Sequence, residues 1–223
     1  QAILTTDTKA KTLCLKLSVD GKLCTLTGFA KGSGMIHPNM ATMLGFVVTD
    51  CAIDALTQQA LLSELTPQTF NQITVDGDTS TNDMVLLLAN GLAGNQPVNE
   101  EHPEYAKVKQ AYHFMLTELA KMIAQDGEGA TKLIEVNVKG AKNETQARIA
   151  AKNIVGSSLV KSAIFGADPN WGRIISSLGA SQIELEPTQI DVSINQMAVV
   201  KNRAATSFNP DEVSELLKNS TIV

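Results

Sequence analysis

The chain has 223 residues, 43% of them hydrophobic and 18% charged, which is typical of a globular protein with one large domain or two closely joined ones. Its net charge of −5 and its lack of basic runs argue against nucleic acid as a partner. No apolar stretch reaches the length of a membrane span, and the first residues lack the architecture of a signal peptide. We therefore expect a cytoplasmic protein that binds neither nucleic acid nor membrane.

The first segment predicts a β-hairpin, because two runs of β-forming residues flank Asp20-Gly21, a dipeptide typical of a two-residue turn. Such a turn places Cys24 opposite Leu17 rather than opposite Cys14, which disfavours a disulfide across the hairpin. The three cysteines of the chain include no CxxC pair. We expect all three to be reduced and buried.

A loop rich in Gly, Pro and Asn follows at residues 31–40, and the apolar run at 42–51 is typical of a strand buried on both faces. Asp54 is expected to cap a helix, and a second short helix has Pro67 in its first turn. Residues 73–91 predict a strand, a polar turn and another strand.

The clearest helix lies at residues 101–126, where apolar side chains recur at alternating three- and four-residue steps and form one stripe. This spacing is typical of a helix that packs on a core. Gly127 is expected to end the helix.

The last part of the chain mixes short strands with helices. A strand at 131–140 precedes one long helix at 144–165, Asp168 is expected to cap a short helix that starts at Pro169, and residues 209–219 form the last helix. Because strands and helices do not alternate strictly, we predict mixed sheets covered by helices rather than a doubly wound fold.

The junction Ala41-Thr42 joins the flexible loop to the apolar run. If the bond between them were cut, Thr42 would become an N-terminal residue whose own α-amine can take the proton of its hydroxyl. This amine titrates at roughly pKa 7.7 to 8.0, so it can act as a base near neutral pH. The alternative from residue types alone is that Thr42 simply opens a strand, which threonine favours.

The sequence "KGSGMIHPNMATMLGF" at 31–46 resembles the self-cleavage segment of the ornithine acetyltransferase family, also known as bifunctional glutamate N-acetyltransferases. Four further blocks agree with the family in order: "QAILTTDT" at the start, "DGDTSTND" at 76–83, "DGEGATKL" at 126–133 and "DPNWGR" at 168–173. Agreement of five blocks favours a nucleophile at Thr42 over an ordinary strand residue.

The resemblance implies an α/β (α+β) sandwich of mixed sheets covered by helices, similar to the fold of N-terminal-nucleophile and DmpA-like hydrolases. The precursor would cleave itself between Ala41 and Thr42, so that residues 1–41 end an α chain and residues 42–223 form a β chain without its C-terminal end. Thr42 would take the acetyl group of N-acetylornithine and pass it to glutamate in arginine biosynthesis. Some members also accept acetyl-coenzyme A as a donor. The implied assembly has two α and two β chains.

Three other residues match the family's substrate site. Lys31 would bind a substrate carboxylate, Thr5 in "TTDT" would contact the substrate, and Glu128 would bind an ammonium group of ornithine or the Thr42 amine. Their plainer interpretations are a solvated loop lysine, an edge-strand hydroxyl and a solvated acid at a helix end. The neighbouring Thr6 leaves the register of the first block open.

Four residues of the family blocks are expected to be structural: Asn82, Asp83, Asn170 and Arg173. Neither the family's oxyanion-hole Thr-Gly pair nor its C-terminal Asn and Ser or Thr has a counterpart here, and the chain opens and ends in strand-like stretches. We therefore expect part of a longer protein, folded but inactive by itself. No metal or organic cofactor is indicated.

Two other functions stay open. One is an amidase or aminopeptidase with the same nucleophile, in which water takes the place of glutamate. The other is an uncleaved, inert fragment that only associates with the rest of its protein. Discharge of the acetyl group by glutamate rather than by water separates the transferase from the amidase.

Overall fold

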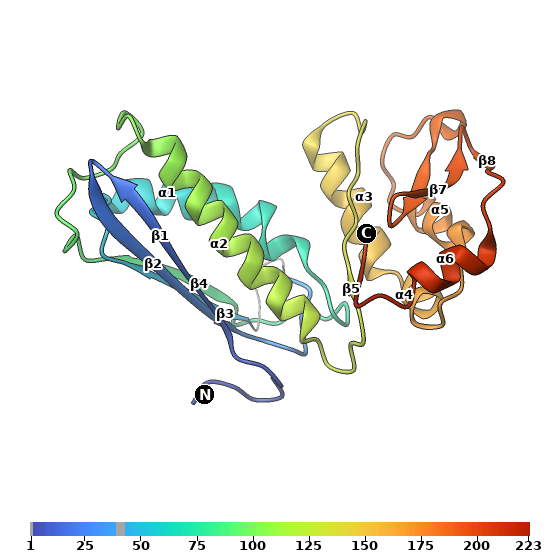
Figure 1. Cartoon of the computed structure of the whole chain (residues 1–223), viewed down its shortest axis with the longest axis horizontal. Coiled ribbons are helices and arrows are strands. Elements are labelled where there is room, and N and C mark those ends of the chain that lie inside the picture. Colours follow the sequence, from blue (N-terminus) through green and yellow to red (C-terminus); the bar gives the residue numbers. More distant parts are fainter. Residues whose placement is uncertain (1, 39–42) are drawn as a thin grey trace. The chain divides into compact units, whose positions relative to one another are not determined.

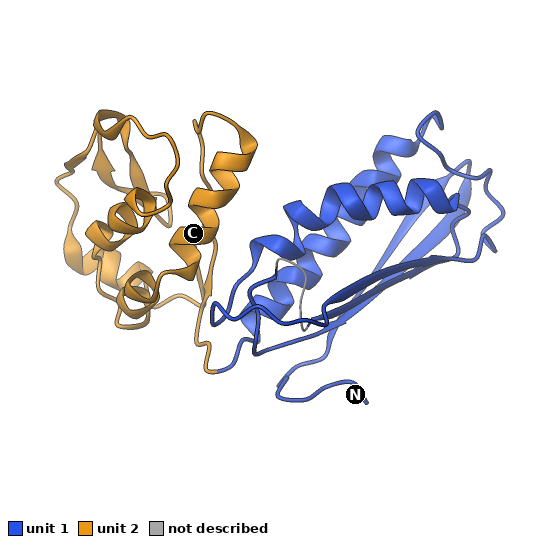
Figure 2. Cartoon of the chain, turned by 180° about the vertical axis from the view of Figure 1, so that it is seen from behind, with its two compact units in different colours: residues 1–128 blue, residues 129–223 orange. Residues whose placement is uncertain are grey.

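The computed structural model describes residues 2–38 and 43–223, and the chain falls into two compact units, residues 1–128 and residues 129–223 (Figures 1 and 2). We call them unit 1 and unit 2. Within the described ranges, no helix combines the length and the apolar character that crossing a membrane requires.

Unit 1 is built on a four-stranded sheet in which two antiparallel pairs are followed by one parallel pair. Its strands, in spatial order, are β1 (Lys11–Val19), β2 (Lys22–Lys31), β3 (Leu44–Thr49) and β4 (Met84–Ala89). The predicted hairpin is confirmed: Asp20 and Gly21 have φ of 50° and 70°, as a type I′ turn needs, and Leu17 faces Cys24.

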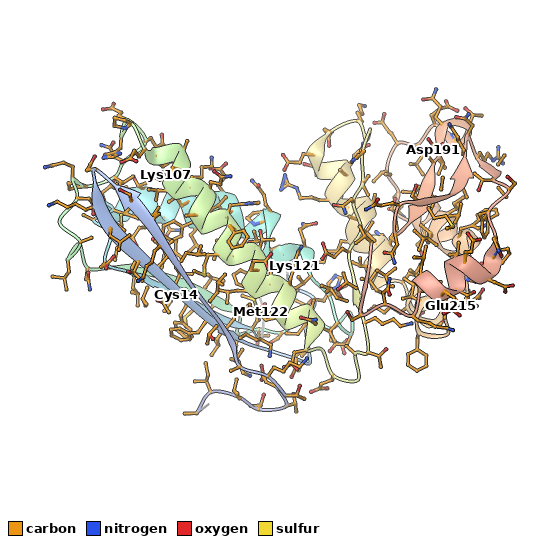
Figure 3. All side chains as sticks on the ribbon, in the orientation of Figure 1. Cys14, Lys107, Lys121, Met122, Asp191 and Glu215 are labelled. Atoms are coloured by element: carbon orange, nitrogen blue, oxygen red, sulfur yellow. The ribbon has the colours of Figure 1, made fainter. Side chains whose placement is uncertain are left out.

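Two helices, α1 (Ala55–Leu65) and α2 (Tyr105–Gln125), cover one face of this sheet, and side chains fill the space between them (Figures 1 and 3). The predicted stripe of α2 forms the centre of the core, where Val108 and Leu119 are fully buried. A Cβ added at Gly28 would lie 2.5 Å from a sulfur of α2, so α2 packs directly on the backbone of β2.

The opposite face of the sheet is apolar but only half-buried. Phe29 and Phe46 stack on it with ring centroids 4.9 Å apart, and Leu86 and Leu88 of β4 are exposed. The prediction that β3 is buried on both faces is therefore wrong, since every second residue is only partly covered. Cys14 points to this same face and is exposed, contrary to the prediction that all three cysteines are buried.

Other boundaries in unit 1 also differ from the predictions. Asp54 caps α1 as expected and accepts the Thr57 N–H at 2.9 Å. The short helix with Pro67 is in fact two 3₁₀ turns, Thr66–Gln68 and Phe70–Gln72. Of the two strands expected in 73–91 only β4 forms.

Unit 2 combines short strands with four helices. A parallel pair joins β5 (Leu133–Ile134) to β9 (Thr221–Ile222), and an antiparallel sheet has the order β6 (Val192–Ile194), β7 (Met197–Lys201), β8 (Ala204–Ala205). The helices are α3 (Glu144–Gly156), α4 (Ser158–Phe165), α5 (Trp171–Gly179) and α6 (Pro210–Leu216). A 3₁₀ turn lies at Pro187–Gln189.

Two helix predictions in unit 2 are wrong. The expected long helix at 144–165 is two helices, because Ser157 has an extended backbone (φ −67°, ψ 120°) and its hydroxyl accepts the Val160 N–H of α4. The helix expected after Asp168 begins later, at Trp171. The expected fold class, mixed sheets covered by helices in an α/β arrangement, is confirmed.

Candidate active site

The two residues of the proposed cleavage site, Ala41 and Thr42, lie outside the residues that the structure describes. The described residues nearest to the cleavage site in the chain are Pro38, which ends the segment before it, and Met43, which directly follows Thr42. The candidate site is therefore defined by the side chains that bind the segment before Pro38 and the backbone of Met43.

The incoming end starts at Lys31, the last residue of β2. This lysine is only 9% exposed and donates from Nζ to Thr5 Oγ1 at 3.1 Å, so it is not a solvated loop side chain. Thr5 lies before β1 rather than in an edge strand. Its neighbour Thr6 turns to another partner, Ser33 Oγ, at 2.7 Å. Of the two threonines, it is thus Thr5 that meets Lys31.

Glu128 lies three residues past the end of α2 and reaches the same segment. Its backbone N–H donates to the Ser33 carbonyl at 2.8 Å, and its carboxylate lies over Gly34, where an added Cβ would be 2.6 Å from Oε1. The Glu128 side chain is nevertheless exposed to solvent. Residues 31–34 thus have a candidate cation and hydroxyl at one end and a carboxylate at the other.

The polar loop at 76–83 holds both ends of the cleavage segment. The Asp76 carboxylate accepts the N–H groups of Met35 at 2.5 Å and Ile36 at 3.0 Å. The Asp83 carboxylate accepts the N–H of Met43, which directly follows Thr42 in the chain. Two carboxylates seven residues apart in one loop therefore bind Met35 and Ile36 before the proposed scissile bond and Met43 after it.

Three charged side chains near these groups are buried and in contact with one another. Lys11 Nζ lies 2.7 Å from Asp7 Oδ1 and 2.6 Å from Asp126 Oδ2, and the three side chains are 1%, 0% and 4% exposed. Burial opposes ionisation of both acids, but hydrogen bonds from Lys11 and from nearby N–H and O–H groups outweigh it. They hold the pKa of Asp7 below its usual range and that of Asp126 at about 2.

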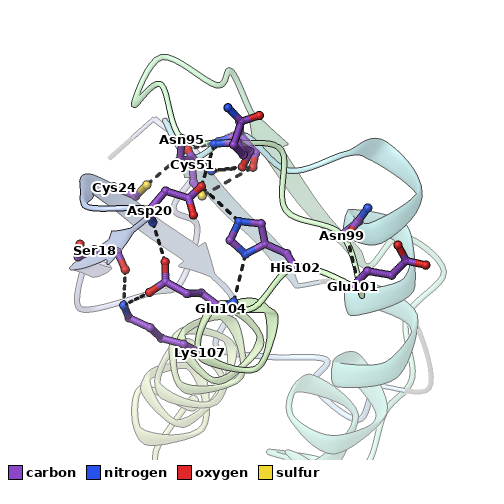
Figure 4. Close-up of polar contacts among 12 residues, drawn as sticks. Ser18, Asp20, Cys24, Cys51, Asn95, Asn99, Glu101, His102, Glu104 and Lys107 are labelled. Atoms are coloured by element: carbon purple, nitrogen blue, oxygen red, sulfur yellow. Dashed lines mark hydrogen bonds and ion pairs between the residues drawn. The ribbon is translucent and has the colours of Figure 1, made fainter.

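The buried cysteines are poor candidates for chemistry. Cys24 donates to Asn95 Oδ1 at 3.7 Å beside Cys51 (Figure 4). Burial raises the pKa of Cys24, and it raises that of Cys51 to about 12, so neither thiol ionises near neutral pH. Among the described residues, no group of three or more His, Cys, Asp or Glu could hold a metal ion.

A model of the ArgJ family matches residues 1–223, the whole chain. The chain belongs to the ArgJ family. It is 54% identical over 223 residues to a protein of Bacillus thuringiensis subsp. konkukian and 51% identical over 222 residues to one of Geobacillus stearothermophilus. Both relatives are named arginine biosynthesis bifunctional protein ArgJ. These matches cover all of this chain but 55% and 54% of the relatives, so the chain spans about half their length.

The ArgJ likeness extends to the fold. A crystal structure of the Bacillus halodurans protein of the same name matches with a TM-score of 0.80 and 50% identity, over 81% of this chain and 86% of that chain.

The residues of the ArgJ blocks divide between the two units. Asn170 and Arg173 lie in unit 2, where Arg173 donates to the Leu159 carbonyl and to Ser162 Oγ at 2.9 and 2.8 Å and so ties α5 to α4. Sequence reasoning expected this structural role. It missed the contact of Asp76 with the cleavage segment and the buried group of Asp7, Lys11 and Asp126. The acidic residues of "TTDT", "DGDTSTND" and "DGEGATKL" were the available sign of these contacts. No spacing rule indicated that they lie near the cleavage segment in the folded chain.

Proposed function

We propose that the protein transfers the acetyl group of N-acetylornithine to glutamate in arginine biosynthesis, through an acetyl-enzyme on Thr42. The observation that carries the proposal is the convergence at residues 31–34, which lead toward Thr42. Lys31 lies there with Thr5 bonded to its ammonium group, and Glu128 packs on Gly34. A cation, a hydroxyl and an anion are the groups needed to bind a substrate that carries both a carboxylate and an ammonium.

The reaction follows from these charges. Lys31 binds the α-carboxylate of N-acetylornithine, and Glu128 faces its side-chain ammonium group or the free amine of Thr42. The Thr42 amine takes the hydroxyl proton, the oxygen attacks the acetyl carbonyl, and the amide C–N bond breaks as ornithine leaves with that proton. The α-amine of glutamate then attacks the ester, which yields N-acetylglutamate and restores Thr42. We also propose that acetyl-coenzyme A can serve as a second acetyl donor.

Self-cleavage precedes the transfer. The Thr42 hydroxyl attacks the Ala41 carbonyl, and the peptide C–N bond breaks as the ester forms, which frees the Thr42 amine. Water then hydrolyses the ester to the Ala41 carboxylate and the Thr42 hydroxyl. The products, residues 1–41 and 42–223, remain together because β2 and β3 pair in register from Leu26 opposite Thr49 to Lys31 opposite Leu44. We further propose that the assembly contains two α and two β chains and that it is cytoplasmic.

The test uses the protein expressed from its complete coding sequence. Its intact mass is measured under denaturing conditions, before and after addition of N-acetylornithine with a deuterated acetyl group. We expect two chains, a label on the peptide that begins at Thr42, and faster loss of this label with glutamate than with buffer. Thr42→Ala should give one uncut chain without label, and Thr12→Ala, at an exposed threonine of β1, should behave as the wild type.

Two outcomes would contradict the proposal. Label loss that glutamate does not accelerate would instead indicate an amidase. A single uncut chain that still transfers acetyl groups would remove Thr42 as the nucleophile.

A further inference from the structure

The three proposed substrate residues come from segments far apart in sequence. Thr5 precedes β1, Lys31 ends β2, and Glu128 follows α2. Direct contacts between these segments include the bond from Lys31 to Thr5 and the bond from the Glu128 N–H to Ser33. Single hydrogen bonds contribute about 1 kcal/mol each and fix positions weakly. The precise placement of the three side chains therefore needs further support.

The buried group of Asp7, Lys11 and Asp126, which we call the buried trio, touches each of these segments. The Asp7 carboxylate accepts the N–H of Gly32, next to Lys31, at 2.7 Å and the N–H of Thr5 at 3.3 Å. Each of these two segments is thus bonded to one and the same carboxylate.

The third segment is held by the other acid. Asp126 stands directly after α2 and two residues before Glu128. Its carboxylate accepts the N–H groups of Thr8 at 3.0 Å and Lys9 at 3.2 Å, so it binds the end of α2 to the segment that carries Thr5. Lys11 bridges the two acids, whose bonded oxygens are therefore no more than 5.3 Å apart, the 2.7 and 2.6 Å contacts taken end to end.

Such a group is a poor choice for stability alone. Desolvation of buried ions costs several kcal/mol each, and apolar residues of similar volume often give equal or greater stability. What buried ions provide is direction, because each lone pair and each N–H must point at its partner. The lowered pKa values of Asp7 and Asp126 keep both carboxylates ionised throughout the neutral range.

We propose that the buried trio is the positioning unit of the acetyl-transfer site: it sets the spacing of Thr5, Lys31 and Glu128 without itself touching the substrate. This inference rests on the proposed function. A displacement of about 1 Å in such groups lowers kcat/KM by as much as 100-fold. Because the three side chains bind substrate, we expect most of the loss in KM.

The first variant separates positioning from stability. In Asp7→Asn/Lys11→Met/Asp126→Asn, no buried charge remains and both amide oxygens can still accept N–H groups. We expect an unfolding temperature equal to or above that of the wild type, complete self-cleavage, and a KM for N-acetylornithine raised at least about 10-fold with kcat within about 3-fold. Lys16→Met, an exposed lysine of the same strand, is the control and should match the wild type.

A second variant keeps the charge and changes only the geometry. Lys11→Arg preserves the charge balance, so the chain should fold, but the planar guanidinium cannot hold the two carboxylates at the lysine spacing. We expect KM to rise here as well. Both variants are made in the complete coding sequence, with KM and kcat measured for both substrates alongside thermal unfolding.

The outcomes distinguish the inference from the function on which it rests. If the wild-type protein transfers no acetyl group, the proposed function itself fails. If the wild type is active and either folded variant keeps the wild-type KM, the trio is only structural and this inference is overturned. If the triple variant does not fold, Lys11→Arg alone decides.

Discussion

The two ends of the sheet in unit 1 are both closed by charged side chains, but in opposite ways. At the hairpin turn, Asp20, His102, Glu104 and Lys107 form a chain of contacts at the surface (Figure 4). At the other end, where β1 begins and β2 ends, the buried trio has almost no exposure. Of the two ends, the buried one lies beside the proposed substrate residues Thr5, Lys31 and Glu128.

The difference indicates what each arrangement can do. Exposed ion pairs are screened by water and contribute about 0–1 kcal/mol, so the turn end tolerates loose geometry. A buried trio is intolerant of displacement, because an unpaired charge there is costly. Rigid geometry thus lies where the proposed chemistry needs it.

The largest effect is expected from Lys11→Met as a single change. It leaves two buried carboxylates without their cation, which should lower the free energy of unfolding by about 3–5 kcal/mol. Urea unfolding of the complete protein measures this value. A loss below about 1 kcal/mol, the range of surface pairs, would show that the two ends of the sheet are alike.

Removal of the proposed substrate cation should come next. Lys31→Met should lower kcat/KM for N-acetylornithine about 100-fold, mainly through KM, because a hydrogen-bonded charge pair with the substrate carboxylate is lost. The matched control is Lys22→Met, an exposed lysine at the turn end of the same strand β2. Equal kinetics for the two variants would contradict a substrate role for Lys31.

The acid response of the buried end is the third prediction. The pKa of Asp126 is about 2 in the folded protein and near 3.9 in the unfolded chain, so its stabilising effect is present above about pH 4 and is lost as the pH falls toward 2. The loss amounts to about 2 kcal/mol. Asp126→Asn should flatten the decline of the unfolding temperature between pH 4 and pH 2, whereas Asp78→Asn, at an exposed acid, should not.

The fourth prediction concerns self-cleavage. Asp83→Ala removes the acceptor of the Met43 N–H beside the proposed scissile bond, and we expect cleavage to slow about 10-fold because the attack geometry is relaxed. Asp83→Asn keeps an acceptor oxygen and should cleave faster than Asp83→Ala. A time course of intact mass after rapid purification measures these rates, and equal rates for the two variants would exclude Asp83 as the positioning group.

Local features of the sequence predicted much of the fold in unit 1. Asp20-Gly21 gives the hairpin, and the apolar stripe at 105–122 gives α2, because turn chemistry and helical periodicity are read from neighbouring residues. The break at Ser157 was missed although the residue is a good helix cap. Short strands such as β5 were overextended, since pairing with a distant segment sets their length.

The candidate site was less predictable from physical chemistry alone. Residue types gave only the Ala41-Thr42 junction, and the roles of Thr5, Lys31 and Glu128 came from the family resemblance. The buried trio was not predicted at all. Lys11 and Asp126 are 115 positions apart, and lysine is usually exposed, so nothing local indicates that this one is buried between two acids.

The smallest effect is expected at the turn end of the sheet. Lys107→Met makes the same chemical change as Lys11→Met, but Lys107 is 47% exposed and its partner Glu104 is open to water. The unfolding temperature should therefore move by less than about 2 °C, and KM for both substrates should stay as in the wild type. Thermal unfolding and steady-state kinetics of the two lysine variants, measured side by side, test this expectation. A KM raised by Lys107→Met would mean that the turn end also influences the substrate residues, and positioning would then not be confined to the buried trio.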